Sequence, residues 1–161
     1  MGFATHLGPW LLGTVKNTTG TTAGTIRNMG ATTVTQSATT TVSDTTATTL
    51  FVIPAGAQIT NFFVDITTAY AGTTGNTITI QTSGGSSLAT VGSASTTPLA
   101  IGRATTTLTG AQVGTFVNVG TTDLIVQVIY ACAGTASGGA ATITCQYVVR
   151  GSDGVANPAS A

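Results

Sequence analysis

The sequence predicts an all-β protein, an antiparallel β-sandwich of jelly-roll type with an extended N-terminal arm. Two observations support this prediction: 38 of the 161 residues are threonine, and short stretches of alternating apolar and polar residues are separated by glycine-rich turns. Threonine is β-branched, which restricts its χ1 angle and favours the pleated surface of a strand. Glycines and a proline interrupt any helical period in residues 1–36, and no helix is predicted in the rest of the chain. A closed up-and-down barrel is the alternative architecture.

The chain length predicts one folded domain, flanked by two segments of different composition. Residues 1–36 are interrupted by glycines and contain the only tryptophan, Trp10, the only histidine, His6, and the only lysine, Lys16. We expect them to form the extended arm. Residues 37–150 are expected to form the sandwich, and the turn-rich residues 151–161 a flexible tail.

In residues 32–50, which cross the boundary between arm and sandwich, Val34 and Val42 lie among threonines on either side of Ser37. We predict two weakly amphipathic extended segments here, with an unstructured linker as the alternative. Residues 50–81 are predicted to form a strand, a tight turn, a long strand, a polar turn and another strand. Their simplest arrangement is a β-meander. In the long strand, residues 58–68, one face is apolar and predicted to cover the core: Phe62, Val64 and Ile66.

The second half is expected to supply strands at 88–91, 105–108 and 112–119, and then a hairpin formed by 123–131 and 141–150. Apolar residues occupy both faces of 123–131, which predicts a central strand buried on both sides. The total is about eight strands separated by turns, as in an antiparallel sandwich.

The two cysteines, Cys132 and Cys145, lie near the ends of the predicted hairpin. The expected register leaves their Cα atoms further apart than the roughly 7 Å that a disulfide allows. We therefore expect two reduced, buried thiols, with a disulfide as the alternative. Neither cysteine has a metal-binding spacing with a second cysteine or with His6, so no metal or other cofactor is expected.

The charge content is low, with 5% charged residues against roughly 25% in ordinary soluble domains. A surface with so little charge suggests that it becomes covered in an assembly. The four basic residues are scattered, which gives no electrostatic footprint for nucleic acid. No apolar run is long enough to span a membrane, and the N-terminus lacks the basic start of a signal peptide. We expect the chain to stay in the compartment where it is made.

Catalysis is not expected, because the required groups are missing or badly placed. Asp44, Asp123 and Asp153 occupy turn-like positions, and Asp65 is expected to be solvated or hydrogen-bonded to threonines on a strand face. A serine hydrolase would have to recruit His6 from the glycine-broken arm, without a nucleophile elbow. The glycine-rich stretches match no phosphate loop.

Two stretches, GFATHLGPWLLGTVKNTTGTTAGTIRNMGATTVTQ at 2–36 and IPAGAQITNFFVDITTAYAGTTGNTITI at 53–80, resemble small virion structural proteins of tailed bacteriophages, particularly marine and cyanobacterial ones. The resemblance implies a head decoration, or cement, protein. Such a protein sits on the outer surface of the phage head, has the major capsid protein as its partner and forms a homotrimer. It would be assembled in the host cytoplasm and have no catalytic motif. The arm would reach neighbouring capsid subunits.

Four residues near the start of the arm are the candidate capsid contacts: His6, Trp10, Leu11 and Leu12. An exposed Trp-Leu-Leu is costly in water, so it is expected either to dock on another subunit or to plug the core of its own domain. One rival function is a tail- or fibre-associated module that binds host glycan through exposed aromatics, for which Tyr70 and Tyr130 are the candidates. A pilus-like surface protein is the other rival, but it should carry an export signal.

Overall fold

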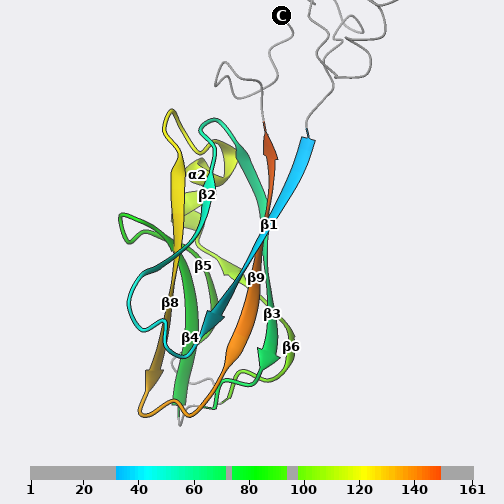
Figure 1. Ribbon diagram of the computed structural model, residues 1–161. Helices are drawn as coiled ribbons and strands as arrows, with labels where there is room; N and C mark the ends of the chain where they lie inside the picture. Colours follow the sequence, from blue (N-terminus) through cyan, green and yellow to red (C-terminus); the bar gives the residue numbers. More distant parts are fainter. Residues whose placement is uncertain (1–31, 72–73, 94–97, 150–161) are drawn as a thin grey trace, which may run out of the picture.

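The computed structural model describes residues 32–71, 74–93 and 98–149, which fold into a sandwich of two antiparallel sheets (Figure 1). One sheet has the strand order β1-β9-β3-β6 and the other β2-β8-β4-β5-β7. The nine strands are β1 (Thr32–Thr41), β2 (Thr48–Ile53), β3 (Gln58–Thr68), β4 (Thr74–Thr82), β5 (Ser87–Gly92), β6 (Gly102–Ala104), β7 (Thr107–Leu108), β8 (Leu124–Ala133) and β9 (Ala140–Val149). The two-sheet antiparallel sandwich predicted from the sequence is confirmed.

The strand pairs are nested within one another along the chain. The chain forms one long hairpin whose paired strands, from the innermost outward, are β4–β5, β3–β6, β2–β8 and β1–β9. Successive pairs lie alternately in one sheet and the other. Because Thr32 pairs with Val149, the described chain begins and ends on neighbouring strands at one end of the sandwich.

Two predicted strand pairings are wrong. The strands β2, β3 and β4 form no meander, because β3 lies in the opposite sheet from the other two. Likewise β8 and β9 form no hairpin, since β8 pairs with β2 and β4 while β9 pairs with β1 and β3. Each of these strands has one strongly apolar face. In a sandwich such faces meet across the core, so consecutive strands lie in facing sheets.

The core lies between the sheets and follows the predicted alternation. On β3 the side chains of Phe62, Val64 and Ile66 are buried, as predicted, while those of Asn61, Phe63, Asp65 and Thr67 are at least partly exposed. The largest fully buried side chains elsewhere in the sandwich include Ile53, Tyr70, Ile78, Ile80, Leu88, Val126, Val128, Tyr130 and Ile143.

The strand β8 is central in its sheet, as predicted, but it is buried on one face only. Val126, Val128 and Tyr130 point into the core, whereas Ile125 is exposed and Gln127 and Ile129 are partly exposed. Nothing among the described residues covers this outer face as a second layer, because the sandwich has only two sheets.

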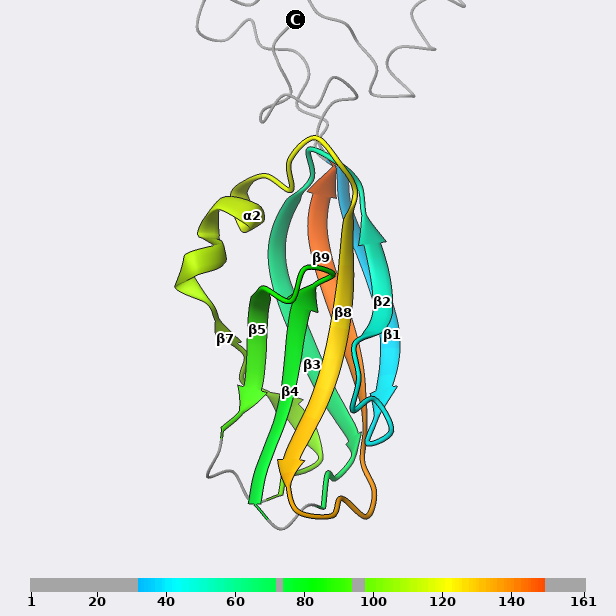
Figure 2. The same ribbon diagram turned by 90° about the vertical axis from the view of Figure 1, so that its left-hand side faces the viewer.

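A short helical segment replaces the strand predicted at 112–119. Gly110–Gln112 forms a 3-10 turn and Val113–Val117 the helix α2, which packs against β3 (Figure 2). Phe116 lies edge-on to the buried Phe62, with 6.3 Å between ring centroids. The spacing of Val113, Phe116 and Val117 fits a helix as well as a strand. Packing of Phe116 on Phe62 explains why the helix forms here.

The first strand starts earlier than the expected boundary of the arm. β1 runs from Thr32 to Thr41 as one continuous strand, so the boundary expected at residue 36 falls inside it. Even-numbered residues such as Val34, Ala38 and Thr40 face the core, and odd-numbered residues such as Thr35 and Ser37 face outward. Regular alternation over ten residues accounts for a strand in place of the predicted pair of segments or the alternative linker.

Candidate interaction surfaces

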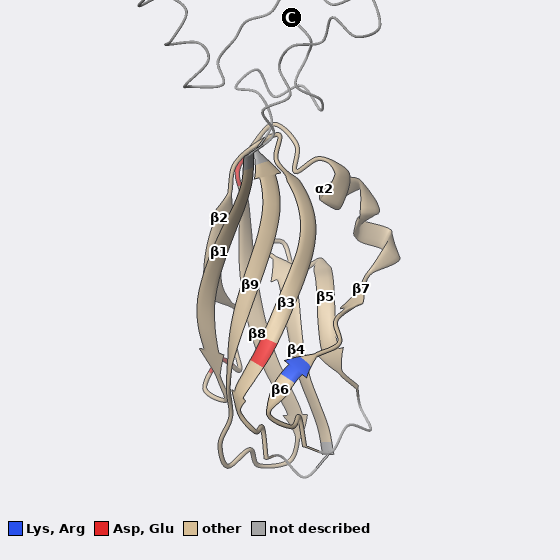
Figure 3. Cartoon of the chain, turned by 90° about the vertical axis from the view of Figure 1, so that its right-hand side faces the viewer, with Lys and Arg blue, Asp and Glu red and all other residues tan. Residues whose placement is uncertain are grey.

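The described surface carries very few charged side chains: Asp44, Asp65, Arg103 and Asp123. Two of them neutralise each other. Arg103 on β6 donates from Nε to Oδ1 of Asp65 (2.8 Å) and from Nη2 to Oδ2 (3.0 Å), and its guanidinium carbon lies 4.9 Å from the ring centroid of Phe63. Figure 3 shows this pair on neighbouring strands of the sheet β1-β9-β3-β6. The sequence predicts that Asp65 is either solvated or hydrogen-bonded to threonines; its side chain is 38% exposed, and its hydrogen-bond partner is Arg103 in place of a threonine.

The Arg103 pair has a local electrostatic and structural effect. The hydrogen bonds and the positive charge of Arg103 lower the pKa of the Asp65 carboxyl below its ordinary value. The bidentate geometry also holds the three-residue strand β6 against β3, where Asp65 and Arg103 are direct cross-strand neighbours. Asp65 is thus occupied by a cation that the chain itself supplies.

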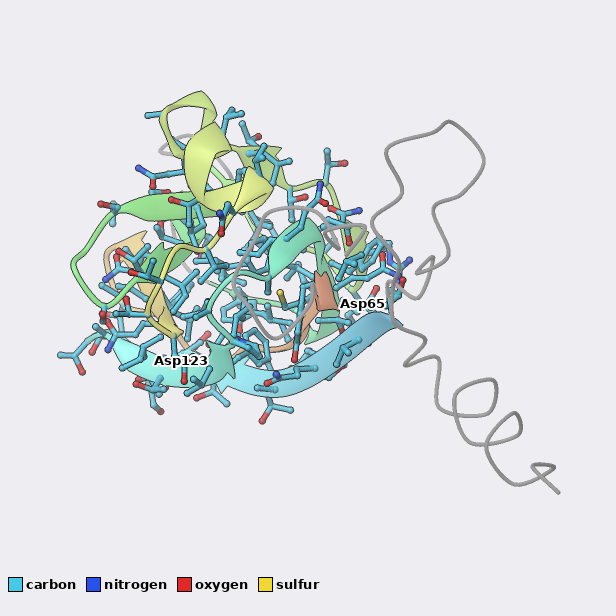
Figure 4. The ribbon with its side chains drawn as sticks, turned by 90° about the horizontal axis from the view of Figure 1, so that it is seen from above. Asp65 and Asp123 are labelled. Atoms are coloured by element: carbon cyan, nitrogen blue, oxygen red, sulfur yellow. The ribbon has the colours of Figure 1, made fainter. Side chains whose placement is uncertain are left out.

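The other two described aspartates hold loops, as their turn positions predict. Burial tends to raise the pKa of Asp44, but hydrogen bonds to its carboxylate outweigh this and lower the pKa overall. The donors include the backbone N–H of Thr41 (2.7 Å) and the hydroxyl of Thr40 (2.8 Å). Asp123 accepts from the backbone N–H of Ala55 (3.0 Å). Figure 4 shows Asp65 and Asp123 well apart, so these two do not form a carboxylate pair.

A polar cluster lies inside the sandwich and contains both tyrosines that were candidates for glycan binding. The rings of Tyr70 and Tyr130 lie 4.8 Å apart, and both side chains are buried. Tyr70 donates to the backbone carbonyl of Thr40 (3.1 Å), and Tyr130 donates to Oδ1 of the buried Asn76 (2.5 Å). The expectation that these tyrosines line an exposed groove is wrong. They connect β1, β4 and β8 within the core.

The buried tyrosines predict a loss of stability at alkaline pH. Burial raises the pKa of Tyr70 and of Tyr130 to about 12, whereas unfolded tyrosines ionise near pH 10. Their stabilising effect is therefore complete below pH 10 and is lost as the pH rises from 10 to 12. Urea titrations between pH 8 and 12 should show the unfolding midpoint falling in this window, and in Tyr70→Phe the fall should be smaller. An equal fall in the variant would contradict the assignment of Tyr70.

The two cysteines are free thiols, as expected. Cys145 is buried in β9, and burial raises its pKa to about 12, so it remains protonated at neutral pH. Cys132 is only partly buried, and its Sγ donates to the carbonyl of Gly134 (3.1 Å). The expected register between them does not occur, because β8 and β9 lie in different sheets.

Two small apolar patches are exposed on the sandwich. In Figure 2 the elements that carry them lie toward the right (β2 and β8) and at the left (α2). The strand patch is the cross-strand pair Val52 and Ile125 on β2 and β8, 48% and 39% exposed. The helix patch is Val113 and Val117 on α2, 55% and 50% exposed. Val113 and Val117 are one helical turn apart and so share a face. Exposed apolar side chains grouped in this way favour contact with another protein surface.

Sequence reasoning missed both patches. Val52 lies in the continuous apolar run 50–53, where no polar residue marks the outer face. The helix patch could not be predicted once residues 112–119 were interpreted as a strand. The candidates His6, Trp10, Leu11 and Leu12 lie outside the described residues.

Other kinds of site have little support in the described part of the chain. Its cysteine and acidic side chains form no group of three that could bind a metal ion. No helix in residues 32–71, 74–93 and 98–149 is long and apolar enough to cross a membrane.

Comparison with known proteins gives only weak likenesses. No protein-family model and no curated protein matches the sequence. A chain of the acidic stable capsid structure of Helicobacter pylori bacteriophage KHP30 aligns at 9% identity with a TM-score of 0.49, over 73% of this chain and 87% of that one. A chain of the cyanophage Pam1 capsid asymmetric unit aligns at 16% identity with a TM-score of 0.46, over 75% and 87%. Values this low carry no conclusion about function.

Proposed function

We propose that this chain is a phage virion structural protein, a decoration or cement protein that binds the outer surface of the head and stabilises the shell. The observation that supports this most is the nature of the sandwich surface. It bears four charged residues, two of which pair with each other, and it exposes two apolar patches. A free soluble domain usually keeps far more charge on its surface, so a surface of this kind is suited to being covered.

The ends of the described chain add a second argument. Thr32 and Val149 are paired at one end of the sandwich, so residues 1–31 and 150–161 are attached side by side there. Segments attached at one end can contact a capsid shell when that end of the sandwich is turned toward the shell. Most of the stretch at 2–36 that resembles phage virion proteins lies in the first of these segments. The two solved structures named above are also from phage capsids, but the proposal does not rest on that weak likeness.

The proposed mechanism is passive. Each copy would bury apolar side chains and backbone polar groups against the shell. Because many copies bind the same lattice, their contacts add up and oppose the expansion of a head that is filled with DNA. Within this proposal His6, Trp10, Leu11 and Leu12 supply the anchor, and the partner is the major capsid protein. A homotrimer is the form that the sequence resemblance implies.

Sedimentation of the purified protein with expanded, undecorated phage heads tests the proposal. We expect the full chain to pellet with the heads at a fixed ratio to the major capsid protein. A variant with Trp10→Ala, Leu11→Ala and Leu12→Ala should stay in the supernatant while its far-UV circular dichroism is unchanged. A control with Thr18→Ala, Thr19→Ala and Thr22→Ala, in the same segment, should bind as the natural chain does.

Two results would count against head binding. One is a folded full chain that remains in the supernatant at all concentrations. The other is a count of only a few copies per virion, which would place the protein at the tail. Loss of folding in the Trp10 variant would show that this residue belongs to the core of its own domain.

A further inference from the structure

The sandwich has four strand edges, and three of them are short or interrupted. β6 has three residues and carries the ion-paired Arg103, and β7 has only two residues. β2 has six residues, with a register shift between Thr49 and Phe51. The side-chain amide of Gln36 also donates to the backbone carbonyl of Val52 on this strand (3.1 Å). Short length, a charged residue, a bulge and a covering side chain are the usual means of protecting a sheet edge.

The edge formed by β1 lacks these protections among the described residues, except at its Thr41 end, where Asp44 covers it. The strand TTVTQSATTT runs for ten residues and pairs with β9 without any register shift. It contains no proline, glycine or charged residue. Among the described residues it has a partner strand on one side only. On the other side the last residue, Thr41, donates its backbone N–H to Oδ2 of Asp44 and accepts from the Asp44 N–H, so the open edge is the part before it. Figure 2 shows β1 at the border of the molecule.

The sequence of β1 is suited to pairing with a copy of itself. If two β1 strands run antiparallel about a two-fold axis at Gln36, Thr33 faces Thr39 and Thr35 faces Ser37 on the outer surface of the sheet. These are β-branched and hydroxyl pairs, which favour cross-strand contact, and no like charges meet. In that arrangement Thr32 and Val149 of one copy lie at the opposite end of the joined sheet from those of the other copy.

We propose that β1 is a dimerisation edge, along which two copies of this chain join their four-stranded sheets into one continuous antiparallel sheet. The contact is isologous, because the same strand is used by both copies. It does not depend on head binding. The trimer implied by the sequence resemblance would need a different surface, because antiparallel pairing of identical strands has two-fold symmetry.

Sedimentation velocity of the full chain between 1 and 100 μM tests the proposal, and a dimer is expected. The edge variant Thr35→Lys with Ser37→Lys places like charges opposite each other and should raise the dimer dissociation constant at least tenfold. The control is Thr142→Lys with Thr144→Lys, on the outer face of β9, one strand further into the same sheet. Both variants remove the hydrogen bond between Ser37 and Thr144, so the loss of this bond cannot cause a difference between them. We expect only the edge variant to become monomeric.

Charge complementation makes the test independent of a folding defect. A second edge variant, Thr35→Glu with Ser37→Glu, should also be monomeric alone, and an equimolar mixture of the Lys and Glu variants should form a heterodimer. A full chain that is monomeric or trimeric would overturn the proposal, and so would an unchanged dimer in the edge variants. If removal of residues 1–31 abolishes the dimer while the edge variants keep it, the contact belongs to the N-terminal segment instead.

Discussion

Replacement of Gly139 by alanine should destabilise the protein by about 3 kcal/mol or more. Gly139 has a φ of +151°, a conformation that residues with a side chain rarely adopt. A Cβ at this position would overlap the ring of Tyr70 and lie 2.9 Å from its Cα. Tyr70 cannot move aside easily, since it packs on Tyr130 and donates to the carbonyl of Thr40. Urea denaturation followed by far-UV circular dichroism would measure the loss.

The neighbouring residue supplies the control for this prediction. A Cβ at Gly138 would meet no atom within 4 Å, and Gly138 does not have a positive φ. Gly138→Ala should therefore change the free energy of unfolding by no more than about 0.5 kcal/mol. Equal losses in the two variants would mean that the loop before β9, and not the contact with Tyr70, determines the sensitivity.

Truncation of Phe62 to alanine should cost about 3–5 kcal/mol, the usual range for a buried phenylalanine. Phe62 is 1% exposed, at the centre of β3, and its ring meets the edge of Phe116. Its removal would leave a cavity between the sheets and take away the aromatic contact that holds α2. The free energy of unfolding in urea and the helical signal in circular dichroism should fall together.

Phe63 is the matched control, because it is the next residue on the same strand and points to the opposite face. Its ring lies under the guanidinium of the exposed Arg103. Phe63→Ala should cost only about 1 kcal/mol. If Phe63→Ala were as destabilising as Phe62→Ala, the assignment of inner and outer faces on β3 would be incorrect.

Alternation along single strands could be predicted from the sequence, whereas the pairing of strands could not. The buried face of β3 follows from the spacing of Phe62, Val64 and Ile66, because side chains alternate between the faces of a strand. The alternation of apolar and polar residues is the same whether two strands pair in one sheet or lie in two sheets that face each other. This is why 123–131 and 141–150 were predicted as a hairpin, although β8 and β9 lie in different sheets.

Surface features were predictable only where they depend on composition. The low charge is read directly from the sequence, and the turn positions of Asp44 and Asp123 predict their loop-holding hydrogen bonds. The pairing of Asp65 with Arg103 joins residues that are 38 positions apart, and no local pattern indicates it. The burial of Tyr70, which lies beyond the end of β3, likewise depends on how the loops pack there, whereas Tyr130 follows the alternation of Val126 and Val128 on β8.

The nested order of the strands has a consequence for how the protein folds. β1 pairs only with β9, and this pair joins residues separated by nearly the whole described chain. Contacts of such high sequence separation make folding slow, on the millisecond to second scale for all-β domains. Ribosomes add about 5–20 residues per second, so β1 leaves the ribosome many seconds before β9 is complete. During synthesis β1 therefore has no partner within its own chain, and a chaperone or another nascent copy has time to bind it first.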